Sequence, residues 1–330
     1  MKIALVVHDF DPRIGHGRYS VELARRLAAR HEVHVWANRF EVPPLPNLHF
    51  RFVPAWRRTA LASVITFLVA SEALLRRERF DLIHAQGLTC WQADVITAHL
   101  CNAARREVDP PRRWRHWVFP LVVCPLEQRF YRQRRASHLI AISGRVAGEI
   151  RSHYGWRRAT SVIYHGTDVE HFCPPSAPEQ RQALWHQFGL PHHAWKWLFV
   201  GEAVKGLGAA IAELPAFPSA HLLVVSRSDL TPYRRLAKSL GVAQRVTYHG
   251  PTQSVLQAYQ AADVLVYPCH YDAFGLVVAE AMACSLPVIV GQNAGAAEWI
   301  EPQRNGLVCN PHQSGSLRAQ LLWLQAVPSR

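Results

Sequence analysis

The sequence predicts an α/β protein with two doubly wound parallel sheets, each in its own domain. Short apolar runs alternate with helix-like segments along the chain, which is typical of parallel sheets covered by helices. A length of 330 residues is generous for one domain and sufficient for two separate cores. A proline-rich stretch, 172–193, separates the two halves of the pattern. We therefore expect domains at 1–171 and 172–330.

In the first half, a strand is expected at 3–7, a helix at 20–29 and a strand at 33–37. The apolar segment 60–75 contains polar residues and is too short to cross a bilayer, so we interpret it as a buried helix. Further short apolar runs are expected to extend the first sheet, at 82–84, 95–97, 139–141 and 162–164.

The second half continues the same alternation and ends in a helix-like run at 314–324. Its strands are expected at 197–200, 221–225, 245–249, 264–267 and 287–290. Ligands of doubly wound sheets bind at the carboxyl ends of the strands. Two Rossmann-like domains facing a central cleft are the expected architecture.

Composition favours a folded cytoplasmic protein. Hydrophobic residues make up 49% of the chain and charged residues 18%, which excludes a disordered protein. The seven cysteines are scattered without Cys-x2-Cys spacing, so we expect free thiols in a reducing compartment and no zinc site. The first residues carry no cationic leader, and a signal peptide is not expected.

The net charge of +13 indicates an anionic partner. The excess is concentrated in 105–135, where arginines alternate with aromatic residues, among them Phe130 and Tyr131. Such a pattern suits the headgroup layer of an anionic membrane, and peripheral attachment at the inner face of the cell membrane is expected. The predicted contact residues are Arg112, Arg113, Trp114, Arg115 and Trp117. A solvated basic face with both tryptophans in the core is the alternative, and the lack of a nucleic-acid-binding module disfavours RNA.

The segment 267–283 is the most informative part of the chain. An apolar strand stops at Pro268, a polar loop follows, and Phe274 and Gly275 open a helix-like run. The N–H groups and partial positive charge of a helix start suit a phosphate or a polyhydroxylated ligand. Asp272 and Glu280 are spaced by about two helical turns, and their carboxylates could accept hydrogen bonds from sugar hydroxyls. An ordinary turn with a surface acid is the alternative.

This segment resembles the acidic-pair motif of retaining glycosyltransferases of family 4, which have the GT-B fold. Four other segments are similar to motifs of that family in the expected order: Gly15 to Tyr19, Ala141 to Ser143, His165 to Phe172, and Phe199 to Leu207. The basic segment 105–135, together with the stretch 224–242, resembles the lipopolysaccharide core glucosyltransferases.

The resemblance implies that the first domain serves the acceptor and the second binds the donor. It implies retaining transfer of a hexose from a nucleotide diphosphate sugar, with a UDP-sugar expected, to a bacterial glycolipid or lipopolysaccharide core. Such enzymes act without a metal or other cofactor. Two rivals remain: a nucleotide-sugar epimerase of the same fold, and a membrane-binding protein whose site has decayed.

The resemblance also implies residue roles. Lys205 contacts the diphosphate, Glu280 the ribose, and Asp272 the transferred sugar. His99 contacts that sugar near the reaction centre, with His84 as the competing candidate. The remaining donor contacts are expected from Gly15, Gly17, Phe274, Gly275 and Leu276.

Three positions bear on the charge of this site. Glu202 stands where the family often has arginine, so one cation is missing or is replaced by Arg227. Asp272 is one methylene shorter than the usual glutamate. Asp9 and Asp11 could suggest a metal pair, but a solvated loop is the preferred interpretation.

Overall fold

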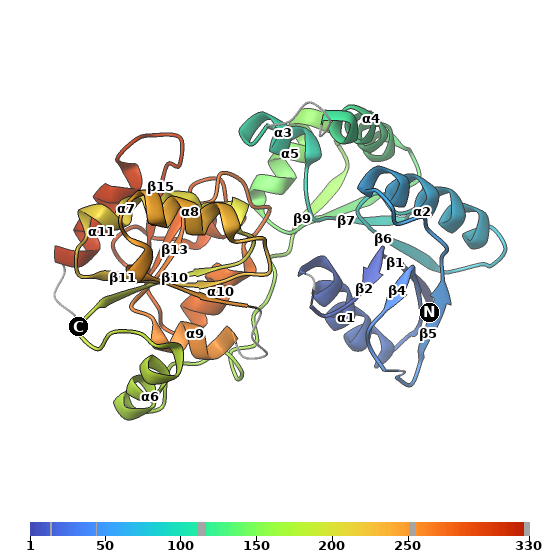
Figure 1. The fold of residues 1–330 in the computed structure, drawn as a ribbon. Coiled ribbons are helices and arrows are strands. Elements are labelled where there is room, and N and C mark those ends of the chain that lie inside the picture. Colours follow the sequence, from blue (N-terminus) through green and yellow to red (C-terminus); the bar gives the residue numbers. More distant parts are fainter. Residues whose placement is uncertain (14, 44, 111–116, 251–254, 327–330) are drawn as a thin grey trace. The chain divides into compact units, whose positions relative to one another are not determined.

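The computed structural model describes residues 1–330 except 14, 44, 111–116, 251–254 and 327–330. The chain forms two compact units, Met1–His165 and Gly166–Arg330, coloured blue to green and green to red in Figure 1. The division falls earlier than the expected position after residue 171.

The first unit is built on a seven-stranded parallel sheet in the order β5-β3-β1-β6-β7-β8-β9. Its strands are β1 (Lys2–Val6), β3 (Glu32–Ala37), β5 (Leu48–Phe52), β6 (Leu82–Gln86), β7 (Val95–Ala98), β8 (His138–Ala141) and β9 (Ala159–Val162). A two-residue pair, β2 (Asp9–Phe10) and β4 (Arg39–Phe40), forms a separate small sheet. The strand order reverses between β1 and β6, and this switch point is where doubly wound sheets bind ligands.

The helices of the first unit are α1 (Gly15–Ala28), α2 (Ala60–Leu75), α3 (Asn102–Val108), α4 (Val118–Arg132) and α5 (Gly144–Tyr154). Side-chain caps define two of their starts. Thr59 accepts a hydrogen bond from the backbone N–H of Ala62 at α2, and Ser143 accepts one from Val146 at α5. Gly155 caps the C-terminus of α5, and its φ of 72° favours glycine.

The second unit has a six-stranded parallel sheet in the order β12-β11-β10-β13-β14-β15. Its strands are β10 (Trp195–Val200), β11 (Ala220–Val225), β12 (Val246–His249), β13 (Val264–Tyr267), β14 (Val288–Gly291) and β15 (Leu307–Cys309). Its α-helices are α6 (Pro178–Phe188), α7 (Leu207–Glu213), α8 (Thr231–Ser239), α9 (Val255–Ala261), α10 (Leu276–Ala283) and α11 (Ser316–Ala326). Here the order reverses between β10 and β13.

The predicted class of two doubly wound parallel sheets is confirmed, with local corrections. Helix α1 begins at Gly15 and not at residue 20, and β9 ends at Val162 where a strand was expected to begin. The edge strands β5 and β15 were not expected. Helix α2 buries Phe67, Leu68, Ser71 and Leu75 along one stripe and exposes Ile65 and Val69, so it is only partly the buried helix expected.

Within the described residues, no helix is both long and apolar enough to span a membrane. The seven cysteines are thiols that form no disulfide bond, and all are buried except Cys173, which is partly exposed.

Candidate functional site

The loop between β13 and α10 is organised around the carboxylate of Asp272. Its Oδ2 accepts hydrogen bonds from Lys205 Nζ and from the Tyr267 hydroxyl, each at 2.7 Å. Its Oδ1 accepts one from the backbone N–H of Phe274 at 3.3 Å. Strand β13 supplies Tyr267, and the turn after β10 supplies Lys205. The two strands at the switch point of this sheet thus converge on one carboxylate.

Lys205 lies at the end of a single 3-10 turn, η2 (Ala203–Lys205), which follows β10. Gly206 follows with a φ of 109°, and a Cβ atom there would lie 2.6 Å from the carbonyl oxygen of Pro268. The turn that carries Lys205 therefore packs directly on the loop that carries Asp272, and only glycine permits this approach.

The charge of Lys205 is stabilised in its surroundings. Burial opposes the ammonium charge, but the ion pair with Asp272 outweighs burial and raises the pKa of Lys205. Burial, together with the charge of Asp272, raises the pKa of Tyr267, which stays a neutral donor. An ammonium group has three N–H donors, of which Asp272 takes one. A fixed cation with further donors is suited to a phosphate.

Glu280 is buried on α10, where its Oε2 accepts a hydrogen bond from the Tyr259 hydroxyl of α9 at 2.9 Å. The helix begins only at Leu276, so Glu280 lies one turn into it and not two as the spacing from Asp272 suggested. Asp272 is held by Lys205 and Tyr267, whereas Glu280 is held by Tyr259. Their assignment to ribose and sugar stays a prediction.

The start of α10 offers backbone donors beside this loop. Gly275 precedes the helix with a φ of 95°, a conformation that favours glycine. First-turn N–H groups, which include that of Leu276, have no acceptor within their own helix. The N–H of Phe274 is already donated to Asp272, so this expected donor serves the loop itself.

The loop after β11 also reaches this turn. Ser228 Oγ accepts a hydrogen bond from the backbone N–H of Ala203 at 3.0 Å. Arg227, the expected substitute cation, is exposed on the same loop. It therefore stands next in sequence to a residue that contacts the Lys205 turn.

In the first unit, His99 follows β7 and is half-buried in a group of aromatic rings. Its ring lies 5.2 Å from that of Tyr19, 6.2 Å from that of His16 and 5.8 Å from that of His165. Nε2–H of His99 donates to Gln86 Oε1 at 2.8 Å, which leaves Nδ1 as an acceptor. Burial and the neighbouring histidines lower the pKa of His99 well below its ordinary value, so the ring is neutral at pH 7.

His84, the competing candidate, is buried in the sheet. Its Nε2 lies 2.7 Å from Thr97 Oγ1, and burial lowers its pKa to about 4. A ring enclosed by its own sheet is less suited to contact a sugar than His99 is.

Gly15 is the exposed first residue of α1, and Gly17 is buried one half-turn later. A Cβ at Gly17 would lie 2.4 Å from the carbonyl oxygen of Asp11, so this glycine is required for packing of the helix on the preceding loop. The expected approach of a diphosphate to both glycines stays a prediction.

Asp9 and Asp11 differ from the solvated loop that was expected. Asp11 is buried and forms an ion pair with Arg13 at 2.8 Å, and Asp9 forms one with Arg57 at 2.5 Å. Each carboxylate is thus neutralised by an arginine.

The basic segment is only partly as expected. Arg112, Arg113, Trp114 and Arg115 lie outside the described residues. Trp117 is partly exposed, with 36% of its surface accessible. Phe130 and Tyr131, which belong to the same aromatic pattern, are buried on the inward face of α4 and do not add to a membrane-facing surface.

The outward face of α4 has a distinct pattern. Val118, Leu121 and Pro125 are exposed in its first half, and Arg129 and Arg132 in its second. These spacings of three and four residues place all five on one helical stripe. Arg129, Arg132 and Arg134 also line an open hollow of about 640 Å³ together with Trp91.

Sequence reasoning missed three residues that hold the candidate groups in place: Tyr267, Tyr259 and Gln86. Tyr267 ends an apolar strand, and a buried tyrosine hydroxyl usually has a hydrogen-bond partner, so this residue could have been recognised. Tyr259 and Gln86 gave no such signal, since their partners are 21 and 13 residues away.

Both halves of the chain match known protein families. Residues 14–171 match the family described as Glycosyltransferase Family 4, and residues 195–326 match the one described as Glycosyl transferases group 1. A D-inositol 3-phosphate glycosyltransferase of Nocardiopsis dassonvillei is 30% identical over 96% of this chain and 82% of its own length.

Solved structures share the fold of both units. WaaG, described as a glycosyltransferase involved in lipopolysaccharide biosynthesis, has a TM-score of 0.82 at 21% identity, over 98% of this chain and 90% of its own. Anabaena HepE in complex with UDP-glucose has a TM-score of 0.74 at 19% identity, over 99% of this chain and 90% of its own. These likenesses identify the fold as GT-B.

Proposed function

This chain belongs to glycosyltransferase family 4 and transfers a sugar from a nucleotide sugar, and from that premise we propose that it moves a hexose from a UDP-sugar to a bacterial glycolipid with retention of anomeric configuration. The observation that carries the proposal is the convergence of Lys205 and Tyr267 on Asp272 beside the start of α10. HepE, which shares the fold, is described in complex with UDP-glucose.

The chemistry of this site suits departure of a diphosphate. Negative charge grows on the leaving group as the glycosidic bond breaks, and a fixed cation with aligned N–H groups stabilises that charge. Lys205 supplies the cation, and the first turn of α10 supplies the N–H groups. In this proposal Glu280 binds the ribose. Asp272 orients Lys205 and also contacts the transferred sugar.

His99 is the proposed contact to the sugar from the first unit. Its ring is neutral at pH 7, and the hydrogen bond to Gln86 fixes its orientation. A neutral imidazole can accept a hydrogen bond from a sugar hydroxyl without introducing charge. The departing phosphate oxygen takes the proton of the acceptor hydroxyl on the same face, so no nucleophilic side chain is required, and the protein contributes positioning and electrostatics.

The proposed acceptor is a glycolipid because of the stripe on α4. Exposed Val118 and Leu121 could enter the interfacial layer, and exposed Arg129 and Arg132 could bind lipid phosphates. WaaG, which shares the fold, is described as a glycosyltransferase involved in lipopolysaccharide biosynthesis, and lipopolysaccharide is a glycolipid. We propose that the protein acts as a peripheral protein at the cytoplasmic face of the membrane, without a nucleic-acid partner.

A second acceptor class has its own support. The relative from Nocardiopsis dassonvillei is named for D-inositol 3-phosphate, a small phosphorylated polyol. Such an acceptor would need no membrane.

The test is a transfer assay with UDP-hexoses and two acceptors, a lipopolysaccharide core glycolipid and D-inositol 3-phosphate. We expect transfer to the glycolipid, a retained anomeric centre by NMR, and unchanged activity in EDTA. Transfer only to the inositol phosphate would favour the second acceptor. An inverted product, or activity restored only by Mg²⁺ or Mn²⁺, would contradict the mechanism. Epimerisation of the donor in the absence of acceptor would favour an epimerase. Donor binding without turnover would favour a membrane-binding protein whose site has decayed.

Membrane attachment has a separate test by vesicle sedimentation. We expect binding to anionic vesicles that weakens as salt rises. Charge reversal at Arg129 and Arg132 together should abolish it, whereas charge reversal at the exposed Arg234 and Arg235 of α8 should not. Equal binding to neutral vesicles would contradict the electrostatic account.

A further inference from the structure

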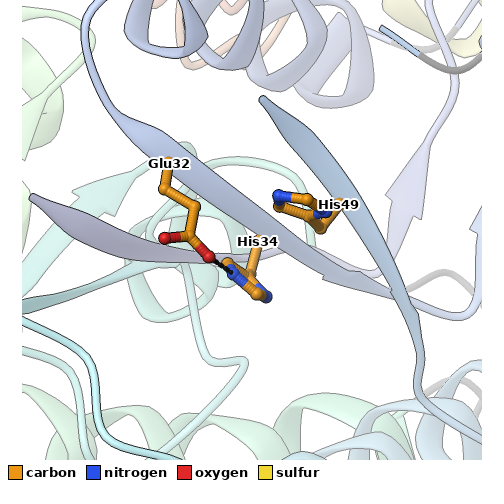
Figure 2. Close-up of side chains that lie close together, drawn as sticks. All are labelled: Glu32, His34 and His49. Atoms are coloured by element: carbon orange, nitrogen blue, oxygen red, sulfur yellow. Dashed lines mark hydrogen bonds and ion pairs between the residues drawn. The ribbon is translucent and has the colours of Figure 1, made fainter. Parts of the chain in front are cut away.

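Three side chains with metal-binding atoms lie together on the first sheet, apart from the groups discussed so far. They are Glu32 and His34 of β3 and His49 of β5 (Figure 2). One ligand atom from each lies within 4.8 Å of the other two. The described residues contain no other such group of three.

The sheet itself brings the three residues together. Glu32 and His34 are two positions apart in one strand, so their side chains leave the same face. His34 and His49 are direct partners in the parallel register of β3 and β5, and their rings lie 4.8 Å apart. The group sits in the amino-terminal half of β3, whereas His99 follows the carboxyl end of β7. It is therefore remote along the strands from the proposed sugar contact.

We propose that Glu32, His34 and His49 form a binding site for Zn²⁺ or a similar divalent transition metal, which would join the edge strand β5 to β3. Two imidazoles and one carboxylate are a donor set that zinc accepts, whereas Mg²⁺ and Ca²⁺ prefer oxygen ligands alone. Three protein ligands leave a fourth position for water.

The distances permit an ion after small side-chain movements. Zinc lies about 2.0–2.2 Å from nitrogen and oxygen ligands, so tetrahedral ligand atoms are about 3.5 Å apart. Glu32 Oε1 and His34 Nε2, now 2.7 Å apart, would separate slightly, and the His49 ring would approach. Glu32 and His49 are exposed and can adjust, while the buried His34 stays in place.

Arg51 competes with the proposed ion. Its Nε–H donates to His34 Nδ1 at 3.2 Å, which requires the ring proton to be on Nε2, where it is donated to Glu32. An ion on Nε2 would move that proton to Nδ1, and Arg51 would lose its acceptor. Its side chain is 43% exposed and has Glu78 as a second partner at 3.8 Å. Without metal, Arg51, His34 and Glu32 are thus joined by two hydrogen bonds, and a bound ion must break both.

The test is a zinc titration of the full chain after removal of metals by dialysis against a chelator. Calorimetry gives the affinity, and thermal unfolding gives the stabilisation expected of an ion that binds the native state. We expect zinc to raise the unfolding temperature, and Mg²⁺ to leave it unchanged. His49→Ala and Glu32→Gln, both at exposed positions, should each weaken zinc binding about tenfold or more.

Two further variants sharpen the result. Arg51→Ala should tighten zinc binding, because it removes both a positive charge and the donor that occupies His34 Nδ1. His153→Ala is the matched control: His153 lies 3.6 Å from Glu107, a histidine and glutamate pair that the three-ligand group does not include. It should bind zinc as the parent does. If His49→Ala also bound zinc as the parent does, or if zinc gave no stabilisation, the cluster would be only a hydrogen-bonded pair with a neighbouring histidine.

Discussion

Gly206 and Pro268 approach so closely that a Cβ atom on the glycine would lie 2.6 Å from the proline carbonyl oxygen and 2.9 Å from its Cγ. The contact joins the turn that carries Lys205 to the loop that carries Asp272. It explains how an ion pair between residues far apart in sequence is held at 2.7 Å.

Gly206→Ala should therefore destabilise the second unit by about 2 kcal/mol or more. The substitution combines a strained positive φ with overpacking against backbone atoms. Urea unfolding would measure the effect. Gly208→Ala is the control, because its Cβ would lie 3.7 Å and 3.9 Å from the nearest two atoms, both in side chains, and alanine favours the helix. Equal stability of the two variants would contradict the close contact.

Lys205→Ala and Glu280→Ala should each weaken binding of a nucleotide sugar by at least about tenfold, or ~1.4 kcal/mol. Each change removes a charged group from the proposed donor site. Calorimetric titration with UDP-sugars would give the affinities. Lys238→Ala removes an exposed lysine of α8 and should leave binding unchanged. Parental affinity in both site variants would show that the donor binds elsewhere.

His99→Ala should lower kcat about 100-fold and leave the fold intact, as expected of a contact that matters most when charge develops at the sugar. The pKa of His99 is lowered well below its ordinary value by burial and by the neighbouring histidines. The ring is therefore neutral throughout the range from pH 6.5 to 9, and its contribution to turnover should not vary there. Steady-state kinetics across that range would test both points. His138→Ala in β8, paired with Ser161, is the control.

Glu127 should make the stability of the first unit pH-dependent. Burial raises its pKa from 4.5 to about 7, although Tyr154 and Asn102 donate hydrogen bonds to it. The folded protein holds this proton at pH values where the unfolded chain releases it. The stabilisation is fully present below pH 4.5 and is lost as the pH rises to about 7, a loss of up to about 3 kcal/mol.

Glu127→Gln removes the titrating group. The free energy of unfolding of this variant, relative to that of the parent, should therefore increase from pH 5 to pH 8. Urea unfolding at intervals across this range would measure the difference. Glu107→Gln, at an exposed position of α3, should follow the parent. Parallel profiles for Glu127→Gln and the parent would mean that the carboxyl does not titrate in this window.

The class of the fold could be predicted from local patterns. Apolar runs such as 197–200 and 264–267 are buried strands because a parallel sheet is covered on both faces and needs continuous apolar sequence. The strand-to-helix junction around Gly275 was also readable, since a strand stop, a polar loop and a glycine are adjacent in the chain. These signals are local, so each can be recognised from a short stretch of the chain.

The partners of the candidate residues were decided only by the tertiary structure. Lys205 meets Asp272, Glu280 meets Tyr259, and Glu127 meets Tyr154 because strand order and helix packing bring distant segments together. Likewise His49 lies beside His34 because the edge strand β5 pairs with β3. The apolar pattern did not reveal β5. Periodicity reports which face of an element is buried, but it carries no information on which other element covers that face.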